Sequence, residues 1–164
     1  MILTFQISSS VSVAKWKVEV YLLDSLIFER GLYRKGVIDH SSLPFITDGE
    51  ILGYQIGSYP NREPVYSVVF SDTARNKLRK LDIPVCCGRH FVIAVDKKPI
   101  LDGYFWTPYS SYSCDFLIVE ISSLNNFEIR NGYPKEHSFG DLPDPRRNSM
   151  LLHAFRETKR LLEI

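Results

Sequence analysis

The fold is decided by residues 65–81, which read VYSVVFSDTARNKLRKL. Val65 to Phe70 is β-branched or aromatic almost throughout, which predicts a strand. Immediately afterwards the apolar residues change to helical spacing, with Ala74, Leu78 and Leu81 on one face. The sequence therefore predicts a strand that runs directly into an amphipathic helix.

Both predicted helices, about 72–81 and 148–162, begin at recognisable N-caps. The candidate caps are Ser71 or Asp72 for the first helix and Asn148 or Ser149 for the second. The side-chain oxygens of such residues accept hydrogen bonds from amides that have no partner in the first helical turn. Residues 133–164 therefore form a C-terminal tether, rich in proline, glycine and charge, followed by the second helix.

Further strands are predicted where apolar residues alternate with polar ones or run continuously between turn residues. They cover residues 3–7, 11–23, 26–33, 51–56, 91–95, 100–106, 114–121 and 127–130. Cys114 to Ile121 is the most apolar of them, as expected for a central strand covered on both faces. We therefore expect a single α+β domain, 1–164, in which both helices pack on a mixed, mainly antiparallel sheet.

The charge and the hydropathy pattern argue against two classes of partner. Twenty basic and nineteen acidic residues leave a formal net charge of +1. A duplex-binding protein usually needs a strong basic surplus to displace counterions from phosphates, so we expect no nucleic-acid partner. No stretch reaches the roughly 20 apolar residues that span a bilayer, so we expect no membrane span.

The N-terminus and the cysteines indicate a compartment. Residues 1–10 lack the basic region and the long apolar run of a signal peptide. Three cysteines are an odd number, which disfavours a disulfide framework and fits a reducing environment. We expect a cytoplasmic protein, and a periplasmic or lipid-anchored location stays open if a leader preceded this sequence.

Three consecutive elements have the order of a known domain. They are a strand ending in Val68-Val69-Phe70-Ser71, a helix entered by Asp72-Thr73-Ala74, and the strand Phe91 to Val95 that turns at Asp96-Lys97-Lys98. In this order residues 51–101 resemble the head subdomain in the first periplasmic domain of the SecD/SecDF protein-export family. The resemblance implies a head-like fold over about 48–121 and contact with protein chains rather than catalysis. This chain has Lys97 where the family has a turn glycine, and it lacks the family's membrane helices, so the transport function does not carry over.

An aromatic run after the predicted hairpin is the candidate partner-binding surface. The candidate residues are Tyr104, Trp106, Tyr109 and Tyr112, with Lys97 and Lys98 in the neighbouring hairpin turn. The segment 107–113 is rich in tyrosine and serine, the composition of adaptable recognition loops. The alternative is that Tyr104, Trp106 and Phe116 complete the core while the serines solvate a turn.

The predicted function is therefore that of a non-enzymatic protein-binding or accessory module with an unidentified protein partner. Among small cytoplasmic bacterial proteins, an inhibitor or immunity-type partner of a toxin is one concrete version. The first helix also carries four basic residues, Arg75, Lys77, Arg79 and Lys80. They form either a solvated face or the contact for an acidic partner.

The rival interpretation is a cysteine-dependent enzyme that uses Cys86 or Cys87 with His90. A thiol near an imidazole and a guanidinium can become a nucleophile. Adjacent residues in a strand point to opposite faces, however, so both thiols cannot face His90 in regular structure. The sequence contains no Cys-x-x-Cys or His-x-x-x-His pair and no glycine-rich phosphate loop before a helix, so we expect no metal and no cofactor.

Overall fold

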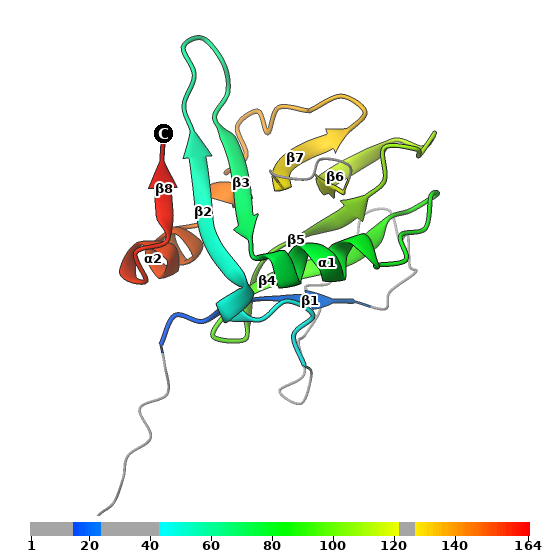
Figure 1. Ribbon diagram of the computed structural model, residues 1–164. Coiled ribbons are helices and arrows are strands. Elements are labelled where there is room, and N and C mark those ends of the chain that lie inside the picture. Colours follow the sequence, from blue (N-terminus) through cyan, green and yellow to red (C-terminus); the bar gives the residue numbers. More distant parts are fainter. Residues whose placement is uncertain (1–14, 24–42, 122–126) are drawn as a thin grey trace, which may run out of the picture.

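The computed structural model describes residues 15–23, 43–121 and 127–164 (Figure 1). Its strands are β1 (Val18–Leu22), β2 (Ile51–Gly57), β3 (Val65–Phe70), β4 (Arg89–Val95), β5 (Lys98–Trp106), β6 (Cys114–Glu120), β7 (Phe127–Tyr133) and β8 (Leu161–Glu163). Its helices are η1 (Asp48–Glu50), α1 (Asp72–Arg79), η2 (Pro145–Arg147) and α2 (Ser149–Glu157), of which η1 and η2 are 3₁₀-helices. The strand predicted at 11–23 is observed as β1, and those predicted at 3–7 and 26–33 lie outside the described residues.

The described strands join into one eight-stranded sheet with the order β1-β4-β5-β6-β7-β3-β2-β8. β5 pairs with β6 and β2 with β8 in parallel, and the other neighbours are antiparallel. The predicted α+β class, with a mixed, mainly antiparallel sheet and two helices, is therefore confirmed. β6 lies inside the sheet, as its apolar run predicted, and Leu117, Ile118 and Val119 are all buried.

α1 begins where the sequence changes its period. Ser71 is the N-cap, since its Oγ accepts a hydrogen bond from the Ala74 amide at 3.2 Å. Ala74 and Leu78 are buried in the main core, so the predicted apolar face packs against the sheet. In Figure 1, α1 follows directly from the end of β3, whereas α2 lies beside β8.

α2 is shorter than the predicted helix over 148–162. It starts as expected, with Asn148 Oδ1 accepting hydrogen bonds from two amides of the first turn. It ends at Glu157, Lys159 takes a left-handed conformation with φ 56°, and the chain continues as β8. The apolar residues after 160 pair with β2 as a new edge strand instead of adding another helical turn.

One carboxylate connects the two ends of the sheet. Asp48 Oδ1 accepts a hydrogen bond from the Val18 amide in β1 at 2.8 Å and one from Arg160 Nη2, just before β8, at 2.6 Å. Arg160 Nη1 also donates to the carbonyl oxygens of Asp48 and Ile51, both at 2.9 Å. Since β1 and β8 are the outermost strands in the order, these contacts draw the two edges of the sheet toward each other.

The main core lies between one face of the sheet and the two helices. The opposite face carries a smaller cluster of Trp106, Cys114 and Ile118, with Tyr104 and Tyr133 at its margin. This second cluster supports the loop that follows β5. Neither α1 nor α2 is long and apolar enough to cross a bilayer, and no other helix of that kind occurs in the described residues.

Candidate functional site

The 107–113 loop joins β5 to β6 and is anchored by hydrogen bonds on two sides. The buried Ser110 Oγ donates to the Val85 carbonyl oxygen at 2.6 Å and accepts from the Tyr112 amide at 3.2 Å. From β7, the Tyr133 hydroxyl donates to the Pro108 carbonyl oxygen at 3.1 Å, with the Ser110 carbonyl oxygen at 3.4 Å. The loop therefore has the composition of an adaptable segment but a backbone that is held in place.

Two of the predicted tyrosines project from this anchored loop. Tyr109 is 86% exposed and Tyr112 is 57% exposed. Aromatic rings on a fixed backbone provide a large contact area with few rotatable bonds to immobilise. Both side chains therefore lie where a partner can reach them.

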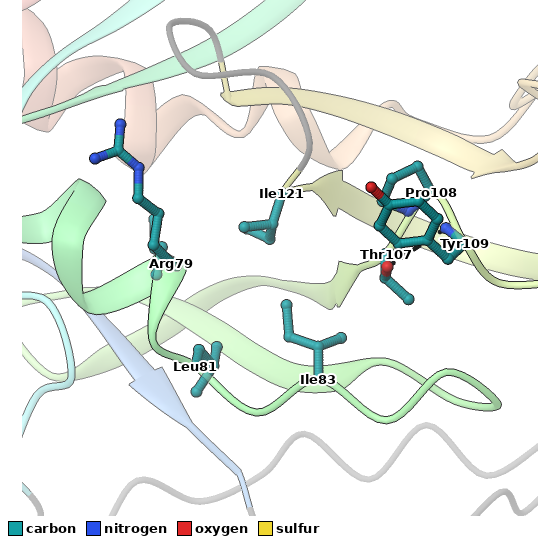
Figure 2. Close-up of a pocket in the computed structure, with 8 residues that line it drawn as sticks. Arg79, Leu81, Ile83, Thr107, Pro108, Tyr109 and Ile121 are labelled. Carbon is teal, nitrogen blue, oxygen red and sulfur yellow. Dashed lines mark hydrogen bonds between the residues drawn. The ribbon is translucent and has the colours of Figure 1, made fainter.

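A pocket of about 370 Å³ opens beside Tyr109, between the loop and the end of α1 (Figure 2). Most of the residues that line it are apolar and come from segments far apart in the sequence, but polar atoms make up the larger part of its exposed surface. The lining residues are Leu78, Arg79, Leu81, Ile83, Thr107, Pro108, Tyr109 and Ile121. In Figure 2, Ile121 lies in the middle of the lining, with Arg79 and Leu81 on one side of it and Tyr109 on the other. The volume is in the range of pockets that accept a small molecule or a few side chains of a partner.

Arg79 is the charged residue of this lining. Its Nη1 donates to Asn76 Oδ1 at 3.2 Å, and it forms no ion pair within the part of the chain that the structure describes. A guanidinium is planar and presents a fork of donors that matches a carboxylate. The pocket therefore combines apolar lining side chains with one positive group that favours an acidic neighbour.

The other basic residues of α1 are largely neutralised within the molecule. Arg75 pairs with Asp72, and Lys77 Nζ lies 2.8 Å from Glu50. Burial alone would raise the pKa of Glu50, but hydrogen bonds from Lys77 and Thr47 lower it below its usual range. Of the predicted basic face, Arg79 and the exposed Lys80 thus form no ion pair within the described residues.

Trp106 and Tyr104 belong to the packed layer beneath the loop. Trp106 is only 1% exposed and sits with Cys114 and Ile118 in the second cluster. Tyr104 is half-buried, its ring stacks on His90 with the centroids 4.7 Å apart, and burial raises the pKa of its phenol. These two residues support the surface, and Tyr109 and Tyr112 form it.

Lys97 and Lys98 lie at the other end of β5 from the loop. They belong to the β4–β5 turn, where Asp96 and Lys97 both have positive φ, at 49° and 65°. Lys98 and Trp106 are the first and last residues of β5. At about 3.3 Å per residue the two ends of this strand are roughly 26 Å apart. The structure therefore does not bring these lysines together with Tyr109 and Tyr112.

The residues of the enzyme alternative have other partners. His90 Nε2 lies 3.2 Å from Asp102 Oδ2. The thiols of Cys86 and Cys87 contact each other, and in the described ranges neither is hydrogen-bonded to His90. The cysteine-dependent enzyme stays a prediction, and the described contacts contain no pairing of either thiol with His90. Among the described residues, no three His, Cys, Asp or Glu side chains gather to hold a metal ion.

Sequence reasoning missed the pocket itself. It assigned Leu78 and Leu81 to the buried face of α1, and it treated Ile83 only as the residue that ends the helix. The available signal was that Leu81 and Ile83 continue the apolar pattern beyond the last turn of α1. Ile121 could not be placed beside them from sequence, because about 40 residues and three strands separate it from α1.

Comparison of the chain with protein-family models, curated proteins and solved structures found no match in any of the three. The resemblance of residues 51–101 to the SecD/SecDF head subdomain therefore stays a prediction.

Proposed function

We propose that this protein is a non-enzymatic binding module that recognises another protein through Tyr109, Tyr112 and the adjoining pocket. The proposal is carried by two exposed tyrosines that stand on an anchored loop, beside a pocket lined mainly by apolar side chains. Soluble proteins normally bury large aromatic rings at least in part, and exposed rings beside a concave apolar site are typical of recognition surfaces.

The pocket fits a large apolar side chain of the partner. Leu81, Ile83 and Ile121 supply the walls, and Tyr109 can cover the inserted side chain from the solvent side. Burying a Leu, Ile or Phe side chain contributes about 1.5–3 kcal/mol. Arg79 would select a partner with a carboxylate next to that anchor, because a paired carboxylate satisfies its guanidinium.

An anchored loop makes this surface efficient. Ordering a flexible loop on binding costs about 0.5–1.5 kcal/mol for each immobilised side chain. Here the hydrogen bonds of Ser110 and Tyr133 hold the backbone before a partner arrives. An inhibitor or immunity-type protein, which has to bind tightly with a preformed surface, is the specific version we favour.

A capture experiment with matched variants tests the proposal. The purified chain and the double variant Tyr109→Ser/Tyr112→Ser are used as bait in lysate of the source organism, and bound proteins are identified by mass spectrometry. The control is Tyr59→Ser, which removes a tyrosine of similar exposure in the β2–β3 loop. We expect a partner that binds the wild type and the control but binds the double variant at least about tenfold more weakly, or ~1.4 kcal/mol.

A charge reversal at the pocket provides an independent check. Arg79→Glu should weaken the binding of the same partner and reduce the salt dependence of that binding, both measured by calorimetry at two ionic strengths. Equal binding of the double variant and the Tyr59→Ser control would remove the support for this surface.

A further inference from the structure

The turn before β4 brings two cysteines together at the surface. The Gly88 amide donates to the Pro84 carbonyl oxygen at 2.9 Å, and Gly88 has a φ of 65°, so the chain folds back over this turn. The Sγ atoms of Cys86 and Cys87 are 2.9 Å apart. In a strand, neighbouring side chains point to opposite faces and their sulfurs are separated. The turn removes that separation, so the two thiols contact each other and can react together.

The two thiols differ in their access to solvent. Cys86 is exposed and Cys87 is half-buried, whereas Cys114 is buried in the cluster around Trp106. The hydrogen bond with Cys86, together with burial and the charge of a Cys86 thiolate, raises the pKa of Cys87 to about 11. Cys87 therefore keeps its proton at neutral pH, and the Cys86 sulfur is the one that a dissolved oxidant meets first.

We propose that Cys86 and Cys87 form an oxidation site that closes reversibly into a disulfide between adjacent residues. A disulfide has an S–S distance of about 2 Å, so the two sulfurs have to approach by only about 0.9 Å. The chemical class of oxidant is a hydroperoxide. This inference is independent of the proposed binding function, because it requires no partner.

The reaction takes place in two balanced steps. The Cys86 thiolate attacks one oxygen of hydrogen peroxide, so that an S–O bond forms, the O–O bond breaks and water is released after protonation. The product is a sulfenic acid, the first oxidation state of a thiol. The Cys87 sulfur then attacks the Cys86 sulfur, the S–S bond forms, the S–O bond breaks, and the leaving hydroxide takes the Cys87 proton as water. The dithiol is oxidised by two electrons and the peroxide is reduced to two waters.

The same geometry makes the bond easy to open. A disulfide between neighbouring residues closes a small ring that includes a peptide bond, and strained or exposed disulfides have more oxidising potentials than buried structural ones. Two equivalents of glutathione would restore both thiols and leave one glutathione disulfide. The site therefore cycles, unlike a structural bridge.

The test follows the peptide that carries both thiols. The reduced full-length chain is treated with equimolar hydrogen peroxide at neutral pH, free thiols are alkylated, and the protein is digested with trypsin. Cleavage after Lys80 and Arg89 releases residues 81–89, which contain Cys86 and Cys87 but not Cys114. We expect this peptide without alkyl groups and lighter by two hydrogens, and we expect glutathione to restore two alkylatable thiols.

Variants distinguish the paired reaction from ordinary oxidation. Cys86→Ser and Cys87→Ser should each prevent the bridge and leave a single thiol that stays alkylatable or becomes over-oxidised, whereas Cys114→Ser should leave bridge formation unchanged. The proposal is overturned if the wild-type 81–89 peptide carries two alkyl groups after oxidation. Bridges found only between chains, or sulfinic acid on one sulfur beside an intact thiol, would overturn it equally.

Discussion

Ser110→Ala would remove one hydroxyl that holds the 107–113 loop in place. That hydroxyl donates to the Val85 carbonyl oxygen at 2.6 Å and accepts from the Tyr112 amide at 3.2 Å. Each such hydrogen bond contributes about 0.5–1.5 kcal/mol net. Val85 and Tyr112 are exposed residues, so water can replace the lost partners and the larger penalty for a buried orphan does not apply. We expect the free energy of unfolding to fall by about 2 kcal/mol, which lowers Tm by roughly 4–8 °C in a chain of this size.

Calorimetry and urea denaturation followed by fluorescence measure this change. The matched control is Ser111→Ala, an exposed serine of the same loop, for which we expect a change within about 0.5 kcal/mol. Hydrogen exchange at the Tyr112 amide should accelerate in Ser110→Ala alone. If Ser110→Ala melts within about 1 °C of the control, the loop is not anchored through this hydroxyl, and the argument that its tyrosines are preorganised fails.

Three further substitutions examine other parts of the structure. Arg146 is buried and donates to Asp144 at 3.0 Å, Glu136 at 2.8 Å and the Ile129 carbonyl oxygen at 3.1 Å. Arg146→Ala should therefore lower the free energy of unfolding, measured by urea denaturation, by about 3–5 kcal/mol. The control is the exposed Arg147, for which Arg147→Ala should lower it by less than about 0.5 kcal/mol. Lys97→Gly should stabilise the protein by about 1 kcal/mol, because Lys97 has a φ of 65° that glycine adopts without strain, and a lower Tm would contradict that turn conformation. Burial raises the pKa of Glu128, so its ionised form destabilises the fold at neutral pH. Glu128→Gln should therefore raise Tm at pH 7. The gain in Tm should shrink as the pH falls through the raised pKa, and it should vanish below about pH 4, where the wild-type carboxyl is protonated in both the folded and the unfolded protein.

Local sequence signals predicted the parts of the fold that depend on local structure. The change of period after Phe70, the Ser71 cap and the apolar run of β6 each correspond to an observed element. The end of α2 could not be predicted in the same way. Leu161 and Leu162 continue an apolar pattern that suits a helix or a strand, and the choice depends on the pairing of Leu161 with Tyr54 in β2.

The candidate site was predicted only where composition carries the signal. The tyrosines and serines of 107–113 indicated a recognition loop, but composition did not show that Trp106 is buried while Tyr109 is exposed. Lys97 is close to this loop in sequence and far from it in space, because the whole length of β5 lies between them. The meeting of Cys86 and Cys87 was missed for a related reason, since strand geometry separates neighbours and the turn at Gly88 does not.

The Asp48 carboxylate also constrains the order in which the protein folds. It bonds to Val18 and Arg160, and the contact between Asp48 and Arg160 spans 112 positions of the chain. Contacts of such long sequence separation form slowly, because a long loop must close before they stabilise anything. During synthesis, β2 to β7 can assemble before Arg160 has left the ribosome, but β1 and β8 cannot be joined. Closure of the sheet is therefore a late event, and until it occurs the nascent protein exposes strand edges that a chaperone would have to shield.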